Sequence, residues 1–332
     1  MDQNQQQKPQ ETSISNKVIS LCKRRGFVYP SSEIYGGFSA TYDYGPLGAQ
    51  MLKNIKDLWW KSFVESRLDV VGLDGAIFSH PRTWEASGHV SSFNDPLVED
   101  KKTHVRYRAD HLIEEKLGIE TAKLSFDELQ KILDENNIKS PDGNELTKLK
   151  SFNLMVEAEL GSTDGNKIKA YLRGETCQVI FLQYLNVLQS MRLKIPFGIA
   201  QMGKAFRNEI TTKDFIYRTR EFEQMELEYF IPPNDGQKWY SYWQEFMLSW
   251  FVEKLGMPRD KFRYREIPKE EMSHYAKIQN DFEFESSSGK WFELSPLNHR
   301  GDWDLSRHMQ YSGVDFTYRD QESGESFIPN VI

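Results

Sequence analysis

Apolar residues recur at every third or fourth position in several long segments, which is the spacing of one face of a helix. The segments that predict helices are 15–25, 48–67, 176–192 and 239–255, with a shorter amphipathic one at 124–133. Alternating or short apolar runs predict strands at 70–78, 170–175, 262–267, 282–284, 291–294 and 327–332. Because strands and helices do not alternate regularly, we expect an α+β fold in which an antiparallel sheet is flanked by helices.

Segment 83–169 differs from the rest of the chain in its high charge and its scattered glycine and asparagine residues. We interpret it as an insertion on the core rather than as a separate domain. The first fifteen residues are rich in glutamine and asparagine and lack an apolar cluster, which predicts a disordered tail. The core is therefore expected to run from residue 16 to residue 332.

Two short runs, 207–209 and 218–226, combine arginine, glutamate and an aromatic ring. We interpret both as strands of a hairpin. Because side chains alternate between the faces of a strand, every second residue from Arg218 to Glu228 shares one face. That face suits a ligand with phosphates, a flat base and an amine. The alternative is a solvated, salt-bridged surface, which the apolar segment 196–203 makes less favourable.

Two further segments have both a structural and a functional interpretation. Segment 198–204 has the spacing of a phosphate-binding loop, but Ala205 stands where that loop needs a hydroxyl, so we prefer a buried strand. Thr176 is a candidate helix N-cap, whereas the functional alternative has Glu175 projecting into a cleft to bind an ammonium group. The histidines lack zinc-ligand spacing and are interpreted as structural or surface residues.

Composition narrows the class of protein further. The chain has 332 residues, a net charge of −7 and 13% aromatic residues, so we expect a sizeable core and no bulk attraction to nucleic acid. Its two cysteines, Cys22 and Cys177, fit neither a disulfide framework nor a metal site, which indicates reduced thiols and a cytoplasmic location. We expect no membrane-spanning segment and no secretory signal.

A series of short motifs resembles the class II aminoacyl-tRNA synthetases and, within them, the homodimeric glycine–tRNA ligases. They include Arg-Asn-Glu at 207–209 and Thr-Arg-Glu-Phe-Glu-Gln-Met-Glu at 219–226. The others lie at 23–30, 34–37, 44–48, 84–89 and 106–110. The resemblance covers residues 16–332. It implies a class II catalytic core, a homodimer, and a reaction in which ATP, with Mg²⁺, activates glycine for attachment to tRNA(Gly).

The resemblance also implies roles for individual residues. The helix from Gly48 and the strand ending at Pro81 correspond to the first class motif, which forms the dimer interface. The hairpin corresponds to the second motif, which holds ATP, with Arg207 and Arg220 as candidate catalytic residues. The implied ATP-binding residues are Arg207, Asn208, Glu209, Tyr217, Arg218, Thr219, Arg220, Glu221, Phe222, Glu293 and Leu294, and Glu293 is also implied to bind Mg²⁺. The implied glycine-binding residues are Arg108, Glu175, Phe222, Glu223, Gln224, Met225, Glu226 and Arg300.

Within these sets, Glu209 would meet the adenine amino group and Phe222 would stack on adenine. Glu175 and Glu226 would hold the glycine ammonium, and Arg300 would meet its carboxylate. The implied reaction is attack of that carboxylate on the α-phosphate of ATP with departure of pyrophosphate. It requires aligned anions and charge neutralisation by arginine and Mg²⁺. A pocket closed around glycine would exclude larger amino acids by volume.

The chain departs from this resemblance at three places. It ends at Ile332, before the third class motif and the anticodon-binding domain. We therefore expect a fragment with impaired activity alone, in which 327–332 is an unpaired central strand prone to aggregate. Gly174 and Val179 replace a proline and a glycine of the family pattern, and 295–299 diverges from it, which keeps open a paralogue for another small amino acid. A synthetase-like binding module without catalysis is the other alternative, but the intact hairpin motif favours a ligase.

Overall fold

The computed structural model describes residues 14–332 except 122–123, 163–166, 211–214, 270, 274 and 287–288. Most of the tail expected at 1–15 lies outside the described residues, and helix α1 already begins at Ile14. The helices are α1 (Ile14–Arg24), α2 (Pro46–Trp60), α3 (Pro81–Ala86), α4 (His89–Ser92), α5 (Ala109–Leu117), α6 (Phe126–Glu135), α7 (Cys177–Ser190), α8 (Gly236–Ser249) and α9 (Trp303–Ser312). The π-helical turns η2 (Lys61–Glu65) and η4 (Trp250–Lys254) continue α2 and α8, and short 3₁₀ turns lie at η1 (Glu33–Tyr35), η3 (Pro233–Asp235) and η5 (Arg259–Lys261).

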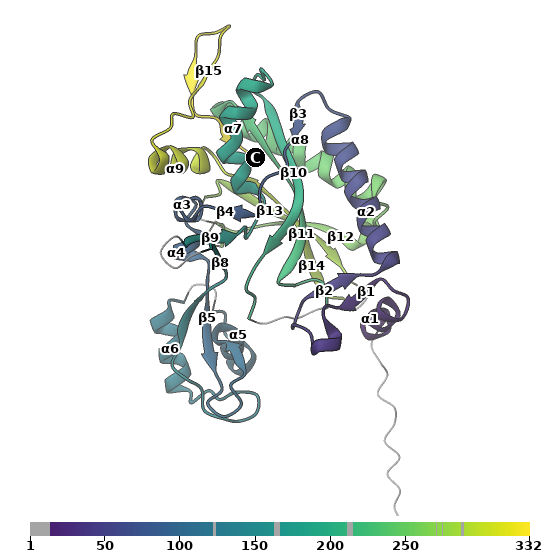
Figure 1. Cartoon of the computed structure of the whole chain (residues 1–332), viewed down its shortest axis with the longest axis vertical. Coiled ribbons are helices and arrows are strands. Elements are labelled where there is room, and N and C mark those ends of the chain that lie inside the picture. Colours follow the sequence, from purple (N-terminus) through teal and green to yellow (C-terminus); the bar gives the residue numbers. More distant parts are fainter. Residues whose placement is uncertain are drawn as a thin grey trace, which may run out of the picture.

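The strands form six small sheets in the described part of the chain. The strands are β1 (Val28–Pro30), β2 (Tyr42–Tyr44), β3 (Val70–Gly72), β4 (Phe78–Ser79), β5 (Asn94–Glu99), β6 (Arg106–Arg108), β7 (Lys150–Asn153), β8 (Val156–Leu160), β9 (Ile168–Leu172), β10 (Phe197–Phe206), β11 (Glu221–Ile231), β12 (Phe262–Glu266), β13 (Ile278–Glu285), β14 (Trp291–His299), β15 (Tyr318–Arg319), β16 (Ser326–Phe327) and β17 (Asn330–Val331). The central sheet has the order β17-β11-β10-β3, and Figure 1 shows β10 and β11 crossing the middle of the molecule. The expected α+β fold with antiparallel strands is confirmed, although β3 runs parallel to β10.

The two faces of the central hairpin are covered by different helices. On one face Ala200, Tyr229 and Ile231 belong to a core that is rich in aromatic rings from α2, η2, α8 and η4. On the other face Ile199 and Phe230 pack with side chains of α7 and α9. Neighbouring residues of each strand thus enter opposite cores, which is the alternation expected of a strand covered on both sides. The apolar segment 198–204 forms part of β10, as its structural interpretation predicted.

The segment interpreted as an insertion contains a core of its own. Strands β5, β6 and β7 form a separate sheet, and α5 and α6 pack beside it around Val98, Ile113 and Leu129. Figure 1 shows this part at the lower left, away from β10 and β11. A capping box between Ser125 and Glu128 begins α6. The exact limits 83 and 169 stay predictions.

A third sheet, β12-β13-β14, lies against the aromatic core. Tyr240 of α8 joins the two, because its hydroxyl donates to the Leu297 carbonyl of β14 at 3.0 Å and also to Asn280 of β13. Phe282 of β13 is fully buried. The long β13–β14 hairpin thus forms one wall of the space beside β11.

Four of the predicted strand segments are wrong in extent or in pairing. Segments 207–209 and 218–220 are not strands. One further rung joins the Arg207 N–H to the Arg220 carbonyl, and the Asn208 N–H then donates to the Leu154 carbonyl and the Arg220 N–H to the Ala40 carbonyl. Segment 70–78 is a strand only at β3 and β4. Segment 327–332 is not an unpaired central strand either, since β17 pairs antiparallel with the end of β11 and lies at an edge of the central sheet.

Candidate functional site

Three backbone hydrogen bonds hold the two ends of the loop that joins β10 and β11. The Arg207 N–H donates to the Arg220 carbonyl at 2.9 Å and extends the hairpin by one rung. The Asn208 N–H donates to Leu154 at 2.7 Å, and the Arg220 N–H donates to Ala40 at 3.0 Å. The arginine-bearing ends of the loop are therefore held by backbone contacts to segments that are remote in sequence.

Arg207 lies between two aromatic rings. Its guanidinium carbon is 5.1 Å from the centre of the Phe93 ring and 5.2 Å from that of Phe222, and its Nε donates to the Gly174 carbonyl at 3.0 Å. Cation–π contacts of this kind stabilise a guanidinium by about 0.5–1 kcal/mol each at exposed sites. The side chain is thus held in place while part of its hydrogen-bonding capacity is left for an anion.

Glu209 is buried near several arginines at the end of the loop. Burial raises its pKa, and the charges of Arg218 and Arg207 only partly offset that effect. Arg108 of β6 lies near Glu209. Its Nη1 contacts Asp95 at 3.0 Å, and its Nε donates to Asp110 at 3.1 Å. The insertion therefore contributes a clamped arginine close to the hairpin loop.

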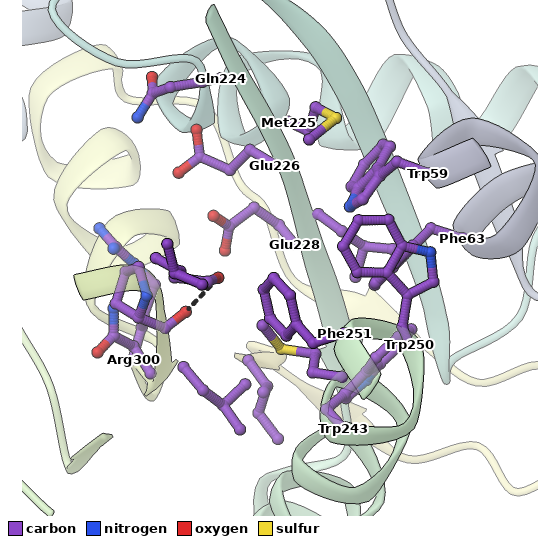
Figure 2. Close-up of a pocket in the computed structure, with 18 of the residues that line it drawn as sticks. Trp59, Phe63, Gln224, Met225, Glu226, Glu228, Trp243, Trp250, Phe251 and Arg300 are labelled. Atoms are coloured by element: carbon purple, nitrogen blue, oxygen red, sulfur yellow. Dashed lines mark hydrogen bonds between the residues drawn. The ribbon is translucent and has the colours of Figure 1, made fainter. Parts of the chain in front are cut away.

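A cavity of about 330 Å³ lies alongside β11 and is bounded by β14, α2, α8 and η4. Figure 2 shows its two chemically different sides: Glu226 and Glu228 project from β11 toward Arg300, whereas Met225 projects the opposite way, toward Trp59 and Phe63. Alternation along the strand produces this division. One side offers charges and the other an aromatic wall.

Two carboxylates from different elements lie close together near the start of α7. Thr176 is the N-cap residue, but its hydroxyl donates to Glu226 of β11 instead of capping the helix, and its N–H donates to Gln224 Oε1 at 3.1 Å. Glu175 Oε1 lies 3.2 Å from His89 Nε2 and 2.9 Å from the Cys177 thiol. The sequence-predicted pair Glu175 and Glu226 is therefore brought together at one end of the polar side.

The pKa values of Glu226 and Glu175 are shifted in opposite directions. Burial and the charge of Glu175 together raise the pKa of Glu226 to about 7. Burial acts in the same direction on Glu175, but the contacts with His89 and the charge of Arg300 outweigh it and lower the pKa of Glu175. Burial and the charge of Glu175 raise the pKa of the Cys177 thiol. Glu175 is consequently the ionised member of the group at neutral pH.

Arg300 directly follows β14 and forms a bidentate pair with Asp304 of α9, with Nε–Oδ2 and Nη2–Oδ1 distances of 2.6 and 2.9 Å. Its guanidinium carbon is 3.8 Å from the centre of the Tyr275 ring. The planar fork of arginine suits such paired recognition of a carboxylate. The residue expected to meet the glycine carboxylate is therefore held by a carboxylate of this chain in the structure.

Four further residues that the sequence predicted for the site lie on the hairpin, its loop and β14. Tyr217 donates to the Glu293 carbonyl at 3.0 Å, which joins the hairpin loop to β14, and Leu294 lines the cavity. Glu293 is exposed and lies opposite Glu283 across the β13–β14 ladder, and Glu283 also pairs with Arg263. Carboxylate oxygens are the kind of ligand that Mg²⁺ prefers. Glu223 instead contacts Lys56 of α2 at 3.0 Å.

The remaining hairpin residues lie near the start of β11. Thr219 is buried and its hydroxyl donates to the Glu221 carbonyl, while the Glu221 side chain pairs with Lys204 of β10. Arg220 donates from Nε to the Glu209 carbonyl at 3.2 Å. Val179 does not line the cavity, because it packs against Gly75 on the other side of α7.

Sequence reasoning missed four residues that shape this region. His89 and Phe93, from α4 and the turn after it, contact Glu175 and Arg207. Asp304 pairs with Arg300, and Gln178 bridges it to His308, with Gln178 Nε2–Asp304 Oδ1 and His308 Nε2–Gln178 Oε1 distances of 3.3 and 3.0 Å. A spacing of four from residue 300 to 304 to 308 was the available signal. His308 is a buried structural histidine, as interpreted, while His274 lies outside the described residues.

Comparisons with known proteins agree with this arrangement. Residues 156–328 match the family model described as "tRNA synthetase class II core domain (G, H, P, S and T)". The chain is 48% identical over 323 residues to the glycine–tRNA ligase of Geobacillus kaustophilus, covering 95% of this chain and 70% of that protein. It is 48% identical over 317 residues to the glycine–tRNA ligase of Treponema denticola, covering 95% of this chain and 66% of that protein.

A solved structure shows the same fold at low sequence identity. The prolyl-tRNA synthetase from Cryptosporidium parvum, complexed with L-proline and AMP, superposes with a TM-score of 0.60 at 12% identity and covers 96% of this chain and 50% of that one. The antiparallel hairpin with its arginine-bearing loop is thus part of a class II tRNA synthetase core. Within that class, the chain belongs to the glycine–tRNA ligase family.

Proposed function

We propose that this protein activates glycine with ATP and attaches it to tRNA(Gly). The observation that carries the proposal is the proximity of two buried carboxylates, Glu175 and Glu226, beside the loop that presents Arg207, in a chain of this family. An ammonium group fits between two buried carboxylates because it supplies the charge and the hydrogen-bond donors they lack. These relatives are longer proteins, and this chain spans about two thirds of their length. The activity is therefore proposed for this chain on the residues that it contains.

In this proposal the hairpin loop holds ATP. The glycine carboxylate oxygen attacks the α-phosphorus, the bond to pyrophosphate breaks, and a tRNA hydroxyl later displaces AMP. Arg207 lies where it can neutralise charge that develops on the α-phosphate, and Arg220 supports the triphosphate. Mg²⁺, held by Glu293 with Glu283 beside it, would supply further neutralisation of the phosphates.

Selection of glycine follows from the crowding around Glu175 and Glu226. His89, Cys177 and Thr176 contact these two carboxylates, and we infer that they restrict the space for a side chain on that side of the bound amino acid. Overfilling such a packed site costs about 1–3 kcal/mol. We therefore expect glycine to be preferred over alanine and serine. Val179 would act on this preference only through the position of α7.

The test is amino-acid-dependent exchange between pyrophosphate and ATP, measured with glycine, alanine and serine. Glu226→Gln should weaken glycine use about 10- to 100-fold, because a hydrogen bond to a charged partner is worth about 1.5–3 kcal/mol. Arg207→Ala should abolish exchange, whereas the matched control Arg106→Ala, an exposed arginine of the insertion, should not. ATP binding measured by calorimetry separates the hairpin's role from catalysis. Exchange that prefers serine, or ATP binding unaffected by Arg207→Ala, would refute the proposal.

We also propose a homodimer that uses α2, β3 and the segments beside them. This surface exposes Ile34, Tyr35 and Phe38, which are 86%, 87% and 69% accessible, and Met51 of α2 at 55%. An apolar surface of this kind is typical of a protein interface. Light scattering coupled to size exclusion should give twice the chain mass, and Met51→Glu should lower it. A cytoplasmic location is proposed from the two free cysteines; none of the described helices is long and apolar enough to cross a membrane.

A further inference from the structure

We propose that Cys177, Glu226 and Glu228 form a binding site for a thiophilic divalent cation of the zinc class. The Cys177 sulfur and one carboxylate oxygen from each glutamate lie within 4.8 Å of one another. Cys177 is the first residue of α7, and the two glutamates are successive same-face residues of β11. The three ligand atoms therefore come from elements that the fold already holds together.

Glu228 is the observation that points to a ligand. Its residue is 5% exposed, and none of the side-chain hydrogen bonds or ion pairs given above for the described residues involves it, although the charge of Arg300 acts on it. It lines the cavity, and Figure 2 shows its carboxyl group beside that of Glu226 on the side facing Arg300. A buried carboxylate without a partner is costly, and coordination to a cation is one of the few ways to compensate it.

The charged groups around these three residues also favour the binding of a cation. Arg300 is the cation closest to this group, but two of its nitrogens are bonded to Asp304. Burial raises the pKa of Glu226 and of Glu228, and the charge of Arg300 only partly offsets that effect. A divalent cation would stabilise the ionised form of both carboxylates.

The donor set favours zinc or cadmium over magnesium. A thiolate is a soft ligand that selects zinc-like ions, whereas Mg²⁺ prefers oxygen ligands in octahedral geometry and retains its waters. Around Zn²⁺, sulfur lies at about 2.3 Å and oxygen at about 2.0–2.2 Å. Ligand atoms in a tetrahedral site are thus about 3.3–3.6 Å apart, so the three groups need to close by about 1 Å. The Cys177 thiol proton leaves to solvent on coordination, and no redox change occurs.

The site overlaps the carboxylate pair to which the proposed function assigns the glycine ammonium. Glu226 would serve both the metal and the ammonium, so metal and glycine should exclude each other. This consequence rests on the proposed function, whereas metal binding itself does not. The two can therefore be tested separately on the same chain.

The experiment titrates the purified chain with Cd²⁺ and follows the ultraviolet charge-transfer band of a cadmium–thiolate bond, in the presence of excess Mg²⁺. We expect one equivalent of Cd²⁺ per chain and the same stoichiometry for Zn²⁺ by calorimetry. Cys177→Ala should abolish the band and weaken Zn²⁺ binding by at least about tenfold. Cys22→Ser, which changes the second free thiol, is the matched control and should leave both unchanged. Glu228→Gln should weaken binding while keeping the band.

A band that survives in Cys177→Ala, disappears in Cys22→Ser, or never forms would overturn the metal site. Cys177→Ser keeps the volume of the side chain and replaces Cys177→Ala in the test if the latter fails to fold. Glycine added to the Cd²⁺-loaded chain should release the ion. Binding that depends on Cys177 but resists glycine would retain the metal site and contradict the placement of glycine in the proposed function.

Discussion

Substitution of Gly75 by alanine provides a sharp test of how α7 is positioned. A Cβ atom at Gly75 would lie 2.4 Å from Val179 Cγ1 and 2.9 Å from Cγ2, about 1 Å short of ordinary van der Waals contact. Gly75 is not among the glycines with a positive φ, so alanine meets no backbone penalty. We expect Gly75→Ala to lower the free energy of unfolding by about 1–3 kcal/mol, the usual cost of overpacking.

The structure also predicts how this cost can be removed. In a Val179→Ala background the two Cγ atoms are absent, so the Gly75→Ala penalty should fall below about 1 kcal/mol, with Gln201 Oε1 at 3.0 Å as the remaining close contact. Val187→Ala, on the same helix but away from Gly75, is the matched background. Urea unfolding followed by circular dichroism measures the three single variants, the two double variants with Gly75→Ala, and the parent chain. Equal Gly75→Ala penalties in the Val179→Ala and Val187→Ala backgrounds would refute the packing argument.

Three further predictions concern stability. Burial raises the pKa of Asp281 to about 6, above its value in an unfolded chain. Ionisation of this carboxyl group therefore lowers the stability of the fold as the pH rises from 4 to 6. Asp281→Asn should stabilise the protein at pH 8 but not at pH 4, which urea unfolding midpoints measured at both pH values would show. Tyr229→Phe removes a 2.7 Å hydrogen bond to Asp69 and should cost about 1–2 kcal/mol in urea unfolding, with no loss if that bond is unimportant. Ser125→Ala breaks the capping box with Glu128, and amide exchange should accelerate in α6 by a factor matching about 1 kcal/mol, without change in α7.

Local patterns in the sequence were sufficient for α1, α2, α6, α7 and α8 and for which side chains of β11 share a face, but not for α3, α4, α5 and α9. A strand alternates its side chains whatever surrounds it, so Gln224 and Glu226 contact Thr176 while Met225 joins the aromatic core, as the alternation predicts. The class of fold followed from the order of elements together with the motifs. Both depend on neighbours along the chain, which a single sequence displays directly.

The contacts that sequence reasoning missed join positions far apart in the chain. The loop residues were expected to extend the strands, but the Asn208 N–H bonds to Leu154, 54 positions away in the numbering of the chain. The pairing of Gln178 with Asp304 spans 126 positions. Alternation and helical spacing do not encode such partners, because they describe one element at a time. The assignments of ATP and glycine to particular residues stay predictions until binding is measured.

The tryptophans that line the cavity allow its occupancy to be measured by intrinsic fluorescence. Trp59, Trp243 and Trp250 line the cavity on the side opposite the carboxylates. Five of the eight tryptophans lie elsewhere and contribute a constant background. Indole emission depends on the polarity and quenching groups around the ring, so water expelled from this cavity changes the colour and intensity of the light it emits. Occupancy of the space beside β11 can thus be followed in real time with the unlabelled chain.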